Sequence, residues 1–241
     1  MNATRLSWFI PVVCLFLPAA VPFASLLRAA APPALAPEQL EASRVFLEFD
    51  AASGDLALRV GLEGEDWRDI QIVSPDGKML FGARGQGPLS RLGLANLSFA
   101  GVAAPLDQVP LDHVLKAFPE GRYEFVGTTG SGQRVVGHDN LNHVLPAAPV
   151  TDVQVSGTTV TISWQPVTSV AEGFPEAPVE ITGYRVLAEK GFGASLPPTA
   201  TSLVLPSQVV EFLGSGSHRF QVLAIEKGGN RTVSTGSFIL P

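Results

Sequence analysis

Hydrophobic and polar residues alternate in short runs along most of the chain after residue 43, and turn residues separate the runs. Val45-Phe46-Leu47-Glu48-Phe49 and Leu56-Ala57-Leu58-Arg59-Val60 flank a segment rich in Asp, Ala, Ser and Gly, which predicts a hairpin. Residues 70 to 73 and 79 to 81 flank Ser74-Pro75-Asp76-Gly77, with Pro at the second turn position and Gly at the fourth. The pattern therefore predicts two β-hairpins at the start of a first domain.

One segment has the periodicity of a helix. Leu111, Val114, Leu115 and Phe118 recur at spacings of three and four, and Pro110 can occupy the first turn. We expect a short helix over residues 111 to 118, followed by strands at 122 to 128, 134 to 137 and 140 to 144. These elements predict a first β-sandwich domain over residues 43–147 that contains one short helix.

A second set of strands follows Pro146-Ala147-Ala148-Pro149, which we interpret as a domain boundary. The expected strands are residues 153–155, 159–164, 181–189, 202–205, 219–225 and 232–239. Val160, Ile162 and Trp164 share one face by the two-residue period, as do Phe220, Val222 and Ala224, so the two strands are expected to face each other across a core. The fold class is all-β, with two tandem β-sandwiches and the second one over residues 148–241.

Residues 149 to 241 resemble the fibronectin type III family. The resemblance rests, in chain order, on Pro149-Val150-Thr151-Asp152-Val153, Ser163-Trp164-Gln165-Pro166, Gly183-Tyr184-Arg185-Val186, and Phe220-Gln221-Val222-Leu223-Ala224 before Gly228-Gly229-Asn230. It implies a seven-stranded, immunoglobulin-like Greek-key sandwich that works as a binding or spacing module. The family normally has a corner tyrosine two residues before the position of Phe220, where this chain has His218. A histidine nitrogen can replace the hydroxyl donor, although its reach is shorter.

The N-terminal segment predicts export. Residues 6–27 carry no charge and follow Arg5, which is typical of a signal peptide over residues 1–31. The alternative is an uncleaved anchor in the inner membrane through residues 6–27, in which Pro11, Pro18 and Pro22 would interrupt the helix. Residues 32–42 are rich in Ala and Pro and are expected to form a linker.

Charge and cysteine content narrow the compartment and the partners. The formal net charge is −6, so nucleic acid is excluded as a partner, because phosphate contacts need a basic face. The single cysteine, Cys14, lies in the apolar N-terminal run, so the mature protein is expected to have no disulfide. Export without disulfides predicts a periplasmic or extracellular bacterial protein.

Candidate catalytic residues do not form a recognisable set in the sequence. No Gly-x-Ser-x-Gly nucleophile motif occurs, and Gly214-Ser215-Gly216-Ser217-His218 coincides with the expected corner turn. His138 and His143 with Asp139 are the nearest approach to a metal site, but an offset of five places the two histidines on opposite faces of a strand. We expect no catalytic, metal or cofactor site.

Two acidic loops and one tryptophan remain as binding candidates. Asp50, Ser53 and Asp55 form one acidic group, and Glu63, Glu65, Asp66 and Asp69 form another, but neither matches a calcium-binding loop and calcium binding stays open. Trp67, among these acids, is either a core residue or an exposed aromatic that contacts a ligand or partner.

The sequence thus predicts an exported, non-catalytic protein that mediates protein or polysaccharide contacts at the bacterial cell envelope. Two alternatives stay open: a hydrolase that uses paired carboxylates in the first domain, and a purely structural spacer.

Overall fold

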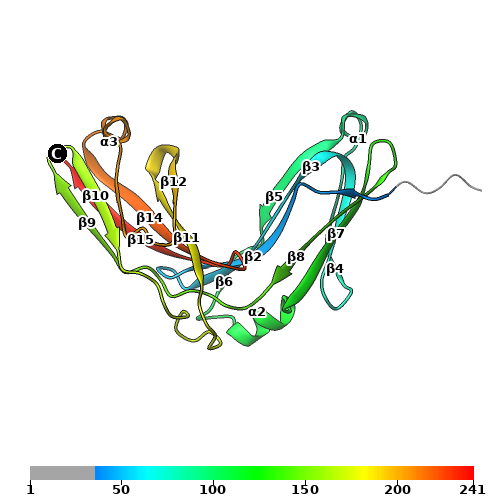
Figure 1. Ribbon diagram of the computed structural model, residues 1–241, viewed down its shortest axis with the longest axis horizontal. Helices are drawn as coiled ribbons and strands as arrows, with labels where there is room; N and C mark the ends of the chain where they lie inside the picture. The colour runs from blue at the N-terminus through cyan, green and yellow to red at the C-terminus, as the bar shows by residue number, and fades with distance from the viewer. Residues whose placement is uncertain (1–35) are drawn as a thin grey trace, which may run out of the picture. The chain divides into compact units, whose positions relative to one another are not determined.

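The computed structural model describes residues 36–241, and the predicted signal peptide over residues 1–31 lies outside this range. The protein is an all-β sandwich protein with few helices (Figure 1). The strands are β1 Glu38–Gln39, β2 Ala42–Asp50, β3 Asp55–Val73, β4 Met79–Arg84, β5 Leu94–Ala100, β6 Ala104–Pro105, β7 Gly121–Thr129, β8 Arg134–Leu141, β9 Thr151–Ser156, β10 Thr159–Trp164, β11 Ile181–Ala188, β12 Phe192–Leu196, β13 Ser202–Val204, β14 Gly216–Glu226 and β15 Arg231–Leu240. The helices are α1 Leu89–Leu92, α2 Leu111–Ala117 and α3 Ser207–Leu213.

Strand β3 organises the first half of the protein. The sequence predicts two separate strands at residues 56–60 and 70–73, whereas the structure has one strand of 19 residues. Its first part pairs with β2 and β5, and its second part pairs with β4 and β7. Asp66 lies between the two parts with a φ of 54°, and the pairing register shifts there. One chain segment therefore contributes to both layers of the first sandwich.

Both predicted hairpins are present. Strands β2 and β3 pair in antiparallel register from Ala42↔Glu63 to Asp50↔Asp55. In the β3–β4 turn, the Gly77 amide donates to the Ser74 carbonyl at 2.9 Å, and Gly77 has a φ of 78°. A positive φ at this fourth turn position is accessible to glycine at no steric cost, which explains why Gly is present there.

The predicted helix is α2, and its hydrophobic stripe faces the first core. Val114 is buried, and Leu111, Leu115 and Phe118 pack against the same cluster. The strand predicted over residues 140 to 144 is wrong in its second half, because β8 ends at Leu141. Beyond that point the carbonyl groups of Asn142 and Val144 accept hydrogen bonds from the side-chain amide of Asn230, the residue just before β15.

The second half contains the six predicted strands as β9, β10, β11, β13, β14 and β15. Val160, Ile162 and Trp164 on β10 share a buried cluster with Phe220, Val222 and Ala224 on β14, so the predicted facing of these strands is confirmed. Two elements were not predicted: the edge strand β12, and α3, which buries Val210 and Leu213.

The two halves are joined through their sheets. Strand β15 pairs in parallel with β2 over Arg231↔Glu48, Thr232↔Phe49 and Val233↔Asp50. A 12-stranded sheet therefore runs from β1 through β3, β2, β15 and β14 to β12, while β9, β10 and β13 form a separate sheet of three strands. Figure 1 shows the blue β2 beside the red β15.

Segments near the expected boundaries also take part in the fold. Part of the expected linker over residues 32–42 pairs with the sheet, because β1 aligns Glu38 with Val135 of β8. On the other side of the expected boundary at residues 147–148, Ala171 and Phe174 pack into the core of the first half. The Phe174 ring meets Phe49 edge to face, with 5.2 Å between centroids. The loop after β10 thus covers the first sandwich.

Candidate functional site

Glu48 occupies the centre of the joint between the two halves. Its side chain, 14% exposed, accepts hydrogen bonds from Arg59 on the neighbouring strand of its own half and from Arg231 of β15. The Arg231 guanidinium also stacks over the Phe46 ring, 4.4 Å from the centroid. Because one carboxylate pairs with arginines from both halves, the joint is held by charge-assisted hydrogen bonds in addition to the backbone ladder.

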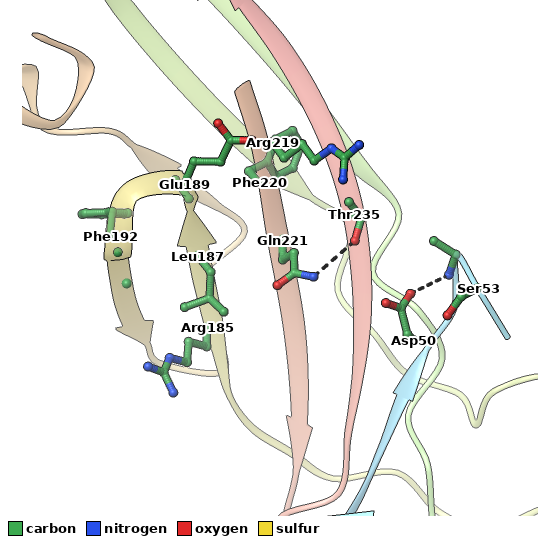
Figure 2. Close-up of a pocket in the computed structure, with 14 residues that line it drawn as sticks. Asp50, Ser53, Arg185, Leu187, Glu189, Phe192, Arg219, Phe220, Gln221 and Thr235 are labelled. Carbon is green, nitrogen blue, oxygen red and sulfur yellow. Dashed lines mark hydrogen bonds between the residues drawn. The ribbon is translucent and has the colours of Figure 1, made fainter. Parts of the chain in front are cut away.

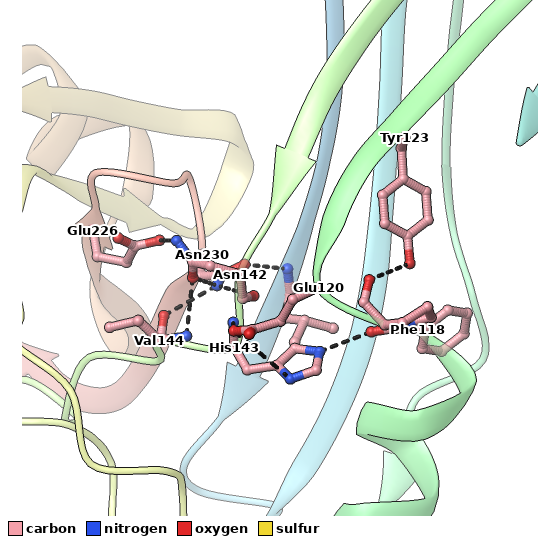
Figure 3. Close-up of polar contacts among 10 residues, drawn as sticks. Phe118, Glu120, Tyr123, Asn142, His143, Val144, Glu226 and Asn230 are labelled. Atoms are coloured by element: carbon pink, nitrogen blue, oxygen red, sulfur yellow. Dashed lines mark hydrogen bonds and ion pairs between the residues drawn. The ribbon is translucent and has the colours of Figure 1, made fainter. Parts of the chain in front are cut away.

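Asn230 is the buried polar residue of the same joint, at 1% exposure. Its Oδ1 accepts a hydrogen bond from the Leu47 amide at 2.7 Å, and its Nδ2 lies 2.7 Å from Asn142 Oδ1, 2.9 Å from the Asn142 carbonyl and 3.0 Å from the Val144 carbonyl (Figure 3). A buried amide with all its groups paired fixes the geometry of the segments around it. The joint is therefore specified by side chains of β2, β15 and the segment that follows β8.

Each half contains a corner in which a ring donates a hydrogen bond to a carbonyl four residues earlier. In the first half, the Tyr123 hydroxyl donates to the Pro119 carbonyl at 3.0 Å (Figure 3). In the second half, His218 Nε2 lies 2.8 Å from the Gly214 carbonyl, so Nε2 carries the proton. The histidine thus performs at this position the role that the fibronectin type III resemblance implies for a tyrosine.

Burial raises the pKa of the Tyr123 hydroxyl to about 12, with a smaller contribution from the negative charge of Asp76. The Asp76 carboxyl has its pKa lowered to about 2 by a hydrogen bond from Lys78, and then by a hydrogen bond from Ser74. Asp76 lies in the exposed β3–β4 turn, so its charge acts through solvent.

A cleft of about 660 Å³ lies between the β2–β3 turn and the sheet of the second half (Figure 2). The side chains that line it come from three places: Asp50 and Ser53 from the turn; Arg185, Leu187, Arg219, Gln221 and Thr235 from the outer face of β11, β14 and β15; and Glu189 and Phe192 from the connection into β12. Figure 2 shows Leu187 and Gln221 between the two arginines, and Gln221 Nε2 lies 3.4 Å from Thr235 Oγ1. The lining combines cations, hydroxyl and amide groups, and part of an aromatic ring.

The two carboxylates of the cleft lie beside different groups of the protein. Asp50 Oδ1 accepts a hydrogen bond from the Ala52 amide at 2.9 Å, which closes the turn. Glu189 Oε2 lies 3.4 Å from Nδ1 of the corner residue His218. The cleft rim is therefore in contact with the buried corner of the second half.

The suggestion that Trp67 is a surface contact residue is corrected by its position. The side chain is 1% exposed and belongs to the first hydrophobic core, and its Nε1 has no hydrogen-bond partner within residues 36–241. Trp67 lies in the long strand β3, where a register shift between Trp67 and Asp69 interrupts the two-residue period, so its ring lies in the same core as Ile70 and Ile72. No ring face is left for a ligand or partner.

The predicted histidine and acid candidates lie in separate local contacts. His143 Nε2 lies 2.8 Å from the Phe118 carbonyl, and the His143 amide donates to Glu120 (Figure 3). The carboxylate of Asp139 accepts from the Val45 amide, and that of Asp69 accepts from the Thr128 hydroxyl. Within residues 36–241, no three His, Cys, Asp or Glu side chains converge in an arrangement that could hold a metal ion. Over the same residues, no helix has the length and hydrophobicity to span a membrane.

Asp50 and Ser53 were named from the sequence as part of an acidic group, but the cleft residues of β11, β14 and β15 were not identified as binding residues. The two-residue period that buries Tyr184 and Val186 also places Arg185 and Leu187 on the opposite face, so the signal was present. The turn that closes the cleft comes from residues 50 to 53, more than 130 positions earlier. Local patterns do not reveal such a contact.

No protein-family model matches the chain, and no curated protein matches it. Among solved structures, the spore cortex lytic enzyme SleM of Clostridium perfringens is 18% identical with a TM-score of 0.31, and the match covers 39% of this chain and 28% of that enzyme. The fibronectin(III)-like modules of CbhA from Clostridium thermocellum are 10% identical with a TM-score of 0.30, and the match covers 83% of this chain and 92% of that one. A tetra-tandem repeat from the extending region of a large adhesion protein is 11% identical with a TM-score of 0.25, over 83% of this chain and 50% of that one. At these TM-scores the matches assign no family or activity to the chain.

Proposed function

We propose that this chain is an exported, non-catalytic β-sandwich protein that contacts a protein or polysaccharide at the bacterial cell envelope. We also propose that residues 149–241 form a fibronectin type III module. The sequence resemblance, the two-sheet arrangement of β9 to β15 and the corner at His218 support this assignment.

The observation that carries the proposal is the cleft between the β2–β3 turn and the outer face of β11, β14 and β15. Both halves contribute to it, and the Glu48 and Asn230 contacts fix one half against the other. A binding surface that is preorganised in this way loses little conformational freedom when a partner binds. A purely structural spacer has no need of a cleft with this mixed lining.

The contacts of the cleft carboxylates favour binding over hydrolysis. A carboxylate hydrolase needs one acid in an apolar setting and a second acid across the scissile bond. Asp50 is engaged with its own turn, and Glu189 is 41% exposed beside His218. Neither residue has the environment that a general acid requires.

A blocked cleft provides the test of binding. The full chain, produced in a bacterial host with its own N-terminal segment, is mixed with envelope isolated from the bacterium that encodes it, and co-sedimentation is measured. Thr235→Trp fills the cleft from an exposed position on β15, whereas Thr159→Trp makes the same change on β10, outside the cleft. We expect Thr235→Trp to lose co-sedimentation and Thr159→Trp to retain it; equal binding by both variants would contradict a role for the cleft.

Two further measurements test the remaining parts of the proposal. Cell fractionation is expected to recover the chain in the periplasm, at the membrane or in the medium, and recovery in the cytoplasm would contradict export. Release of new reducing ends from isolated envelope polysaccharide, lost in Asp50→Asn or Glu189→Gln, would instead support a hydrolase, with its carboxylates in the cleft and not in the first domain alone.

A further inference from the structure

Five of the sixteen basic residues of the chain lie on one face of the 12-stranded sheet. We call this surface the arginine face, and its basic residues are Arg44, Arg59, Arg185, Arg219 and Arg231. The strand registers place them together. On β2, Phe46 is opposite Arg59 of β3, and Glu48 is opposite Arg231 of β15. On β14, Leu223 is opposite both Val233 of β15 and Arg185 of β11. Since side chains alternate along each strand, these residues all point away from the two cores.

Charge is distributed unequally along the arginine face. Its acids, Glu48, Asp50, Asp55 and Glu63, all belong to β2 and β3. The outward positions of β11, β14 and β15 carry Arg185, Arg219 and Arg231 and no acidic residue. The second half therefore presents a cationic surface in a protein whose net charge is −6.

Two of these arginines are available to a ligand in the cleft. Arg59 and Arg231 are paired with Glu48, whereas Arg44, Arg185 and Arg219 form no ion pair within residues 36–241. Of these three, Arg185 and Arg219 line the cleft. From the strand register, four residues along β14 and one strand spacing separate them, which is about 14 Å between Cα atoms. An extended ligand that contacts both guanidinium groups must pass over Leu187 and Gln221.

The rest of the lining identifies the ligand chemistry. Guanidinium groups bind carboxylates in a bidentate manner, so two free arginines favour an anionic ligand. The Asp50 and Glu189 carboxylates on the rim accept hydrogen bonds and repel bare anions. A ligand that fits both kinds of group carries donors beside its acidic groups. Each sugar of a uronic acid polymer has hydroxyl donors next to its carboxylate, whereas the ionised side chains of an acidic peptide only accept and its donors are confined to the backbone.

We propose that the arginine face binds an acidic polysaccharide along the cleft, with Arg185 and Arg219 contacting acidic groups on different sugar residues. This inference rests on the proposed function and specifies its ligand class. Gln221, Thr235 and Ser53 supply hydrogen-bonding groups for sugar hydroxyls between the two arginines, and Phe192 supplies a partly exposed ring at the edge.

Affinity electrophoresis of the full chain in native gels tests the proposal. The gels contain polygalacturonate, alginate, neutral dextran or poly-L-glutamate at a series of concentrations. Arg185→Gln/Arg219→Gln removes the two unpaired arginines that line the cleft, and Arg91→Gln/Arg122→Gln makes the same charge change on α1 and β7, away from the cleft. Thermal unfolding of each variant shows that it is folded.

We expect at least one acidic polysaccharide to retard the chain and dextran and poly-L-glutamate not to retard it. The cleft double variant is expected to raise the dissociation constant by about a hundredfold, since the loss of each of the two charged contacts is expected to cost about tenfold. The control double variant is expected to change it by less than about twofold, because exposed charges act weakly at a distance.

Three results would overturn the proposal. The first is no retardation by either acidic polysaccharide, the second is an equal loss in both double variants, and the third is equal retardation by poly-L-glutamate. Retardation by dextran alone, lost in Thr235→Trp, would overturn the acidic class while supporting the proposed function. If no gel retards the chain but Thr235→Trp still loses envelope binding, the acidic polysaccharide is also overturned. The proposed function is then supported, with a protein as the partner.

Discussion

The Tyr123 corner and the His218 corner are equivalent parts of the two halves. Each follows a seven-residue helix that begins after a proline, Pro110 before α2 and Pro206 before α3. Each ring donates to a carbonyl four residues earlier and opens an antiparallel hairpin, β7–β8 or β14–β15. The same local problem, how to fix the chain between a helix and a strand, is thus solved twice with different side chains.

The two corners differ in the number of polar atoms that each side chain carries. The single polar atom of Tyr123 is used within the corner, whereas His218 has a second nitrogen, Nδ1, which lies 3.4 Å from Glu189 on the cleft rim. The tyrosine corner is therefore self-contained. The histidine corner links a buried position to the surface where we propose that ligand binds.

A second difference appears after the hairpin turns. Gly132-Gln133-Arg134 in the first half corresponds to Gly229-Asn230-Arg231 in the second. The side-chain amide of Gln133 donates to the Ala36 carbonyl near the surface, whereas the side-chain amide of Asn230 is buried in the joint. Gln133 and Asn230 thus occupy equivalent positions after their hairpin turns, but Gln133 lies at the edge of the protein and Asn230 at its centre.

The largest expected effect is that of Asn230→Leu. The substitution leaves the Leu47 amide and the carbonyls of Asn142 and Val144 without partners, which is expected to lower the free energy of unfolding by roughly 3 kcal/mol or more. Urea denaturation measures the change. The matched control Gln133→Leu is expected to change it by less than about 0.5 kcal/mol, as is usual for surface positions, and an equal effect of both would remove the distinction between centre and edge.

Tyr123→Phe is expected to have the next largest effect. It keeps the buried ring but leaves the Pro119 carbonyl without its donor, which is expected to cost about 1 to 2 kcal/mol of stability. The measurement is urea denaturation at neutral pH. An unchanged midpoint would show that the corner does not depend on the hydroxyl.

Alkaline pH should distinguish the two corners. The Tyr123 pKa is about 12 in the folded protein against 10.0 for the unperturbed group, so the unfolded state loses this proton first. The stability contributed by the neutral hydroxyl is present below pH 10 and is expected to fall as the pH rises from 10 to 12. Urea denaturation midpoints measured between pH 10 and 12 are expected to fall less in Tyr123→Phe than in the unmodified protein, and to fall equally in His218→Phe. An equal fall in Tyr123→Phe and in the unmodified protein would contradict the role of the Tyr123 hydroxyl.

His218→Phe is expected to destabilise less than Tyr123→Phe does, by less than about 1 kcal/mol. The variant loses the bond to the Gly214 carbonyl, but it also removes a buried Nδ1 that has no hydrogen-bond partner within the described residues. Comparison of the two midpoints under one condition tests the order. A larger loss in His218→Phe would mean that the contact with Glu189 stabilises the corner more than the buried nitrogen destabilises it.

The smallest effect is expected at Asp76, beside the first corner only. Its lowered pKa means that its contribution to stability is present above about pH 3.8 and is lost as the pH falls toward 2. The effect is small because the group is exposed and solvent screens it. Asp76→Asn should flatten acid denaturation slightly, whereas Asp107→Asn changes an exposed carboxyl that forms no ion pair within residues 36–241 and serves as the control.

Local signals in the sequence predicted the elements that local chemistry determines. Ser74-Pro75-Asp76-Gly77 identified a hairpin turn, and the spacing of Leu111, Val114 and Leu115 identified α2. The continuity of β3 was missed, because Gly64 and a run of acids interrupt the alternation that marks a strand. Helix α3 was missed because its seven residues include the adjacent β-branched pair Val209 and Val210, which does not favour a helix in so short a segment.

The candidate site was less predictable than the fold. Arg185 and Arg219 could be placed on the outer face of their strands, but the turn that faces them is set by the pairing of β2 with β15. Asn230 resembles any turn asparagine in the sequence. Its partners are 86 to 183 residues away, and no local pattern reports on contacts of that length.

The pairing of β2 with β15 also has a consequence for the order of folding. Glu48 and Arg231 are 183 positions apart, so this ladder can form only when nearly the whole chain is available. Until then, the edge of β2 exposes unpaired backbone groups that can pair with other strands. Contacts between such distant positions also slow folding. A chain that crosses a membrane N-terminus first would therefore pass through an interval in which its first sandwich is formed but one strand edge is still open, and truncation of the last ten residues would make that interval permanent.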